Sequence, residues 1–121
     1  MLSPAIALSV GFLLSGLLAA LAGALSRSRQ QNALISAEQA KLAAIVESSA
    51  DGIIGKTLEG RVTSWNRAAE HLFGYRAEEA IGRLMSELIV PSRSQHEEGD
   101  ILAVIRRGGR IDSFNTQRLH K

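Results

Sequence analysis

The feature that most constrains this chain is the uncharged apolar stretch PAIALSVGFLLSGLLAALAGAL, from Pro4 to Leu25. As a helix rising about 1.5 Å per residue, it is long enough to cross the roughly 30 Å hydrocarbon core of a bilayer. No Lys or Arg precedes it, and it is longer than the apolar core of a usual signal peptide. The sequence therefore predicts a short N-terminus at 1–3 and a retained transmembrane helix at 4–25. A signal peptide cleaved near LAGALS is the alternative.

Two basic residues, Arg27 and Arg29, follow the apolar stretch directly. Positive charges that flank a span usually remain on the cytoplasmic side of the membrane. We therefore expect a single-pass chain whose C-terminal part is cytoplasmic.

The composition narrows what the remaining residues can do. The chain has 121 residues, a formal net charge of +2, 4% aromatic residues and no cysteine. Beyond the apolar stretch there is room for one small domain. Without cysteine there is no disulfide framework, no thiol nucleophile, no Cys-type zinc site and no thiol–flavin adduct. The small charge and the few aromatic side chains argue against a nucleic-acid partner.

A helix-prone segment follows, NALISAEQAKLAAIVES from Asn32 to Ser48, which lacks Gly and Pro. Ile35, Leu42 and Ile45 roughly keep the spacing of one apolar helix face. This pattern predicts a juxtamembrane linker or signalling helix at 26–41. It allows a homodimer that pairs through Asn32–Ser48, although barely two heptads are too short to define a coiled coil. A helix that docks on the next domain of its own chain is equally compatible with the pattern.

The pattern then changes to that of a β-hairpin. Gly52–Thr57 and Arg61–Trp65 are the predicted strands, joined by a turn at 58–60. Directly afterwards, NRAAEHLFG predicts a short helix that Asn66 caps and Gly74 ends. A strand that leads straight into a capped helix is typical of a helix folded over a sheet.

Further short helical turns and one longer helix are predicted after the hairpin. AEEAIG ends at Gly82, and MSELIVP ends at Pro91. Ser94 and Glu97 have the spacing of a capping box and open a longer helix, which two glycines close. Ile111–Lys121 is predicted as the last strand. Strands with helices gathered between them indicate an α+β fold with an antiparallel sheet.

Several short motifs stand in a fixed order in the second part of the chain: DGI, WN, AE, FGY, EE and IG. In this order the chain resembles a bacterial PAS domain over residues 42–121. The resemblance implies a five-stranded antiparallel sheet with short helices across one face, onto which Leu72 and Phe73 pack. Two features depart from the family: Arg76 stands where a capping Ser or Thr is usual, and the last two strands do not follow RLHK. We therefore expect a PAS-like domain that is incomplete at its C-terminus and preceded by one transmembrane helix.

The resemblance implies a sensory function in the bacterial inner membrane, with the PAS part in the cytoplasm. Such a module passes a ligand, redox or partner signal to an output domain of the same chain, most often a two-component sensor histidine kinase acting in a phosphorelay. The alternatives are a diguanylate cyclase front end, a haem-binding gas sensor and a ligand-free dimerisation scaffold. No residue pattern within the 121 residues predicts a catalytic site.

The resemblance also nominates site residues. Pockets in this family lie between the longer helix and the sheet, so Ile101, Ile105 and Phe114 are the candidates for lining one. His96, near the start of that helix, is the haem ligand in the gas-sensor alternative. Nothing in the sequence indicates haem or flavin in particular, and the spacing of the His residues predicts no metal site. The residues expected to be structural are Trp65, Asn66, Gly74 and Gly82.

Overall fold

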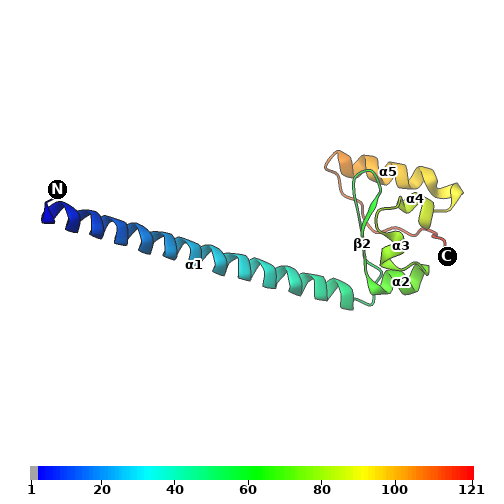
Figure 1. Cartoon of the computed structure of the whole chain (residues 1–121). Coiled ribbons are helices and arrows are strands. Elements are labelled where there is room, and N and C mark those ends of the chain that lie inside the picture. The colour runs from blue at the N-terminus through cyan, green and yellow to red at the C-terminus, as the bar shows by residue number, and fades with distance from the viewer. Residues whose placement is uncertain (1–2) are drawn as a thin grey trace. The chain divides into compact units, whose positions relative to one another are not determined.

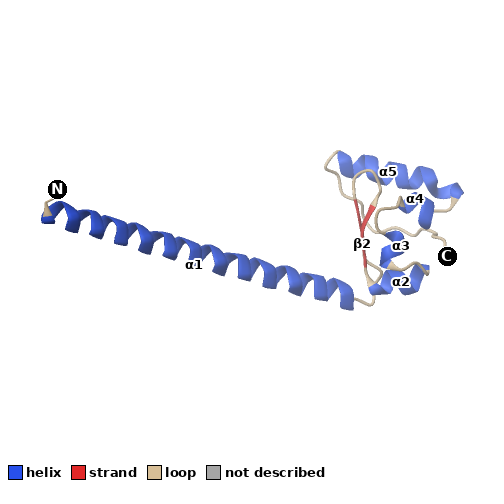
Figure 2. Cartoon of the chain, in the orientation of Figure 1, coloured by secondary structure: helices blue, strands red, loops and turns tan. Residues whose placement is uncertain are grey.

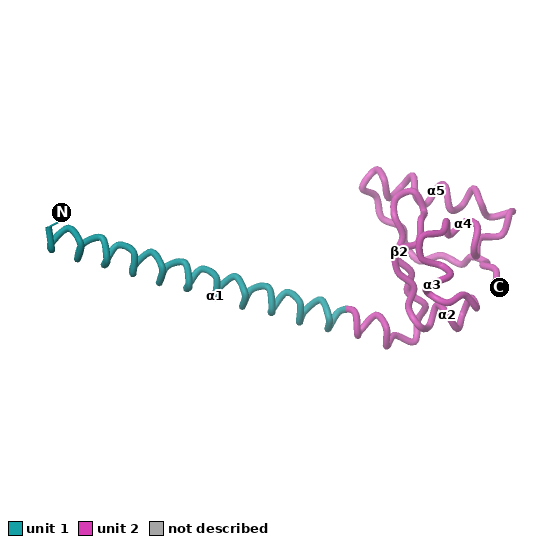
Figure 3. Tube along the Cα trace, in the orientation of Figure 1, with its two compact units in different colours: residues 1–42 teal, residues 43–121 magenta. Residues whose placement is uncertain are grey.

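The computed structural model describes residues 3–121, which form two units. The first unit ends at Leu42, and the second covers residues 43–121 (Figure 3). Each unit is described by itself below.

The N-terminal element is α1, a continuous α-helix of 45 residues, Pro4–Ser48 (Figure 1). The expected juxtamembrane linker and the expected helix at 32–48 are continuous with it, because residues 26–31 contain no Gly or Pro and include Arg and Gln, which favour helix. None of its side chains is buried. By length and composition α1 is able to cross a membrane, a property that N-terminal signal sequences share.

The second unit contains an antiparallel hairpin of β1 (Ile54–Lys56) and β2 (Val62–Trp65), drawn in red in Figure 2. The register pairs Ile54 with Trp65, and an irregularity follows between Gly55 and Lys56. Both strands are shorter than the sequence predicts. The other edge of β2 is covered, because the Val62 N–H donates to Arg83 O and the Gly82 N–H donates to Val62 O, each over 2.9 Å.

Four α-helices and one 3-10 turn complete the second unit. Most of them are short, and together they pack against the hairpin (Figure 1). In chain order they are α2 (Arg67–Phe73), α3 (Ala77–Ala80), α4 (Met85–Leu88), the 3-10 turn η1 (Ser92–Ser94) and α5 (Gln95–Arg106).

The predicted strand at Ile111–Lys121 is wrong, and the described residues hold a two-stranded sheet rather than the five strands that the resemblance implies. We call residues 111–121 the C-terminal arm, which is irregular throughout. The backbone of the arm bonds to helix ends instead of a neighbouring strand. The Leu119 N–H donates to Ile89 O over 2.6 Å, and the Lys121 N–H donates to Phe73 O over 2.9 Å. These bonds give some of the arm's backbone N–H groups the partners that a neighbouring strand would otherwise supply.

Helix α2 has the two ends that its sequence predicts. The Asn66 side chain accepts a hydrogen bond from the Ala69 N–H over 3.0 Å. Gly74 adopts a left-handed conformation with φ of 82°, and its N–H donates to Glu70 O over 2.8 Å. A strand, a capped helix and a sharp exit thus follow one another between Val62 and Gly74.

Two other helix starts differ from expectation. Arg76 supplies no side-chain cap for α3, but Glu79 accepts from the Arg76 N–H over 2.8 Å and Glu70 accepts from the Ala77 N–H over 2.7 Å. Two carboxylates therefore replace the missing Ser or Thr. The capping box expected at the start of α5 is not formed, because the Ser94 side chain makes no capping bond.

The core lies between β2 and the short helices. Trp65 is buried, its indole N–H donates to Tyr75 O over 3.0 Å, and its ring lies 5.5 Å from that of Phe73. Leu72, expected to pack beside Phe73, is 59% exposed because α2 turns Ala69 toward the core instead. The buried apolar cluster consists of Val62, Trp65, Ala69, Ala80, Leu88, Ile89 and Val90.

Candidate functional site

The most highly connected side chain of the second unit is Asn66, which is 2% exposed. Its Oδ1 accepts from the Ile53 N–H over 2.8 Å and from the Ala69 N–H over 3.0 Å. Its Nδ2 donates to Val46 O over 2.9 Å and to Asp51 O over 3.0 Å. A carboxamide has two acceptor and two donor positions, so all of them are used.

These four bonds join three segments. Val46 belongs to the last turns of α1, Asp51 and Ile53 lead into the hairpin, and Ala69 lies in α2. We call this arrangement the Asn66 junction. The sequence predicts only the bond to Ala69, since capping is local, whereas the other three depend on how distant segments meet.

A cleft of about 640 Å³ lies next to the Asn66 junction. One wall is the end of α1 and the residues after it, including Glu47, and the other is the exposed side of α2. Arg67 and His71, one helical turn apart, supply the basic side chains of the α2 wall, and Leu72 adds apolar surface. The cleft is open to solvent and its charged side chains are exposed.

Two of the three predicted pocket residues meet in a second, smaller groove of about 290 Å³. Ile101 and Val104 of α5 form one side, and Ile111 and Phe114 of the C-terminal arm form the other. We call this the α5 groove. Ile105 does not line it and is 39% exposed.

One end of the α5 groove is polar. His96, Glu97 and Asp100 lie there on the first turns of α5. His96 is exposed, and the groove is at the small end of the range for small-molecule sites, roughly 300–1,000 Å³. The haem alternative, with His96 as its ligand, stays a prediction. Residues 3–121 also contain no cluster of three or more His, Asp or Glu side chains able to hold a metal ion.

The opposite side of α5 carries a buried charge that the sequence analysis missed. Glu98 is 4% exposed and forms an ion pair with Lys56 of β1. Its other oxygen, Oε2, is buried and has no hydrogen-bond partner in the described structure. The helical spacing could have indicated that Glu98 is buried, because it stands one turn before Leu102, the buried apolar residue of α5. A carboxylate on the buried face of a helix needs a partner from another element.

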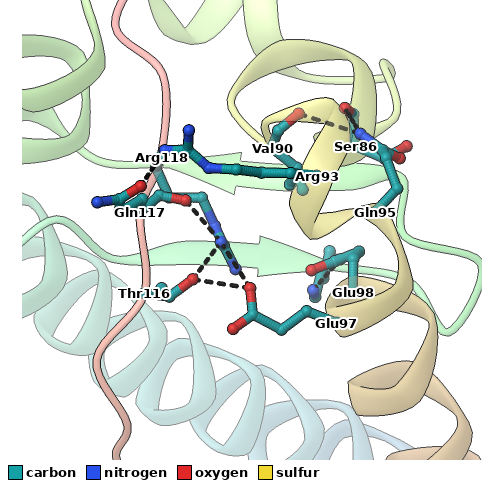
Figure 4. A network of polar contacts seen from close by, with 10 residues as sticks. Ser86, Val90, Arg93, Gln95, Glu97, Glu98, Thr116, Gln117 and Arg118 are labelled. Carbon is teal, nitrogen blue, oxygen red and sulfur yellow. Dashed lines mark hydrogen bonds and ion pairs between the residues drawn. The ribbon is translucent and has the colours of Figure 1, made fainter.

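A polar network holds the C-terminal arm to the start of α5 (Figure 4). The Thr116 hydroxyl donates to Glu97 over 2.8 Å, and an Arg118 guanidinium nitrogen lies 3.3 Å from the same carboxylate oxygen. The Thr116 hydrogen bond, followed by that of Arg118, lowers the pKa of Glu97 below its ordinary value. Nearby, Arg93 donates to the side chain of Gln117.

A second anchor lies at the end of the arm. Lys121 pairs with Glu79 of α3, and this hydrogen bond lowers the pKa of the Glu79 carboxyl group. The Lys121 ammonium also lies 5.2 Å from the centroid of the Tyr75 ring, which Arg83 approaches to 6.0 Å. The arm is therefore fixed at two points by carboxylates from two different helices.

Comparison with known proteins identifies a matching family model and two groups of similar bacterial proteins. The family model described as PAS fold matches residues 40–118. An uncharacterized protein of Azorhizobium caulinodans is 37% identical over 83 residues, which is 67% of this chain and 11% of the relative. The cell-division control histidine kinase PdhS of Brucella ovis is 30% identical over 89 residues, or 74% of this chain and 8% of the kinase. The PdhS of Brucella abortus matches equally. This chain thus spans about a tenth of the length of these relatives.

Proposed function

The chain belongs to the PAS family, and we propose that it is the membrane-anchored sensory module of a bacterial signalling protein. The family match and the similarity to a histidine kinase support a sensory role in signal transduction. In the proposal, α1 crosses the inner membrane at 4–25, and residues 42–121 form the cytoplasmic PAS domain. The output domain lies in the same parent protein and is a histidine kinase that feeds a phosphorelay.

The observation that best supports a signalling role is the Asn66 junction. In this proposal, a change in the packing of the hairpin or α2 is passed to the last turns of α1 through the Asn66 side chain, whose four hydrogen bonds join them. A ligand or partner that binds one of two packings better shifts the population toward it. The α5 groove, with Ile101 and Phe114, is the proposed ligand site.

The output is tested on the full-length product of the natural gene. We expect incubation with ATP to give an acid-labile, base-stable phosphoryl group, as phosphohistidine does. Formation of cyclic diguanylate from GTP would instead identify the diguanylate cyclase alternative. A protein that does neither would contradict both assignments of the output.

Membrane anchoring is tested by intact mass and flotation of the 121-residue chain expressed in bacteria. A retained helix gives the full 13.0 kDa mass in the membrane fraction after an alkaline wash. A cleaved signal sequence gives a shorter, soluble product. A fluorescent protein fused after Lys121 reports the expected cytoplasmic side.

The proposed homodimer is tested with single cysteines, since the chain has none of its own. Leu42 and Glu47 are both exposed on α1 but lie on nearly opposite faces of the helix. Pairing through the face of Ile35, Leu42 and Ile45 predicts rapid disulfide formation by Leu42→Cys and little by the control Glu47→Cys. Equal crosslinking of both variants, or none, would reject pairing through this face.

A further inference from the structure

The chemistry of the α5 groove narrows what it can bind, and the inference below rests on its proposed role as the ligand site. The apolar lining comes from two separate segments, with Ile101 and Val104 on α5 and Ile111 and Phe114 on the C-terminal arm. Phe114 is 46% exposed, so part of its side chain is available to a ligand. A groove of about 290 Å³ suits a small molecule with a short apolar body.

The polar end of the groove has an excess of negative charge. Glu97 is already matched by the Thr116 hydroxyl and the Arg118 guanidinium. Asp100 is exposed and forms no ion pair within the described residues. No Lys or Arg lines the groove. One carboxylate is therefore left over at the end of an apolar surface.

We propose that the α5 groove binds a small organic cation, an ammonium group on a short apolar body. The ammonium lies against Asp100, which acts as its counter-ion, and the apolar body lies against Ile101, Ile111 and Phe114. The aromatic ring adds attraction for a cation that approaches its face. An anion of the same size is repelled by Asp100 and finds no Lys or Arg in the groove, where His96 is the one basic side chain.

The test uses the full chain in nanodiscs of phosphatidylcholine, whose headgroup has no net charge. Three probes of similar size share a phenyl ring and carry a positive, a neutral and a negative head group: benzylammonium, benzyl alcohol and benzoate. Binding is followed by the methyl signals of Ile101 and Ile111, with the buried Ile89 as an internal reference outside the groove. We expect saturable shifts with benzylammonium, a dissociation constant about five-fold weaker for benzyl alcohol, and no shift with benzoate.

Two matched substitutions test whether the preference for a cation depends on Asp100. Asp100→Asn should remove the preference for benzylammonium over benzyl alcohol. Asp112→Asn makes the same charge change on the arm, at a residue that does not line the groove, and should preserve the preference. If both variants lost the preference for benzylammonium equally, the preference would come from the overall negative charge of this surface, which would contradict a specific role of Asp100 as counter-ion.

The remaining outcomes separate this inference from the proposed function. Equal binding of benzylammonium and benzyl alcohol would refute the cation and leave an apolar ligand site. Preferential binding of benzoate would refute it outright. If no probe moves the groove signals, the groove is not a site for such ligands, while membrane anchoring, pairing and output are decided by their own experiments.

Discussion

The two halves of the second unit are stabilised by different interactions. In residues 43–90, β2 and the short helices bury every member of the apolar cluster, including Val62, Trp65 and Ile89. In residues 91–121, Leu102 is the only large apolar side chain that is buried. This half is held together by the contacts of Glu97 with the arm, and ion pairs of Glu98 with Lys56 and of Lys121 with Glu79 attach it to the first half.

This difference predicts which part of the second unit unfolds locally first. Burial of large apolar side chains contributes roughly 1.5–3 kcal/mol each, whereas an exposed ion pair such as that of Lys121 with Glu79 contributes about 0–1 kcal/mol. We therefore expect α5 and the C-terminal arm to open locally while the apolar cluster stays closed. Substitutions in one half should leave the other half measurably intact, and the following predictions test that separation.

The largest effect is expected inside the apolar cluster. Ile89 is fully buried, and Ile89→Ala should lower the free energy of unfolding by about 2–5 kcal/mol because it leaves a cavity. Urea titration of the full chain, followed by the fluorescence of Trp65, its one tryptophan, measures this loss. Leu72→Ala, at a residue 59% exposed, is the control and should change stability by less than about 0.5 kcal/mol.

The Asn66 junction should be nearly as sensitive. Asn66→Asp keeps the shape but removes both donors, which leaves Val46 O and Asp51 O facing a carboxylate. We expect a loss of about 2–4 kcal/mol and faster hydrogen exchange at the Ile53 amide. The exposed Asn115→Asp provides the same chemical change outside the junction. Similar stability for the two variants would show that the junction is unimportant.

The buried ion pair gives an intermediate effect. Lys56→Met leaves the Glu98 carboxylate buried and without its partner, so the unfolding free energy should fall by about 2 kcal/mol. Adding Glu98→Leu should recover most of that loss, because an apolar pair of similar size has no buried charge. A double variant that is less stable than Lys56→Met would mean that the pair contributes through something other than its charge.

The smallest effect is the response of the arm to acid. Glu97 and Glu79 have pKa values below their ordinary 4.5 in the folded chain. Their contacts therefore stabilise the docked arm above pH 4.5, and this contribution is lost as the pH falls through the lower folded-state values. Amide signals of residues 116–121 should shift there before Trp65 fluorescence changes. In the variant Glu79→Gln/Glu97→Gln this early shift should disappear.

The helix caps could be predicted from the sequence, whereas the backbone partners of distant segments could not. Asn66 and Gly74 end α2 through contacts within four residues, so their types and spacing are sufficient. The arm was predicted as the last strand from its place in the order of elements, but a strand also requires a free neighbouring edge. Instead, Ile89 and Phe73 offer their carbonyl oxygens, and the arm bonds to them.

The lining of the α5 groove could likewise be predicted only in part. A helical pattern identifies the apolar positions of α5, and Ile101 does line the groove. The pattern does not say which of these positions the arm covers, so Ile105 was nominated although it lies outside. Glu98 illustrates the converse, because a charged residue type suggests exposure and only contact with Lys56 explains its burial.

The continuity of α1 has a consequence for how such a chain can evolve. Between the apolar stretch and Ser48 the helix has no break, and its side chains are not buried. Substitutions there outside the proposed pairing face of Ile35, Leu42 and Ile45 should be mostly neutral, because few neighbours are disturbed. A single inserted or deleted residue is different, because it turns the later helix positions by about 100° around the axis and so divides the face of Ile35, Leu42 and Ile45. Natural variation in this stretch should therefore favour changes of residue type and disfavour changes of length, except in steps close to whole turns.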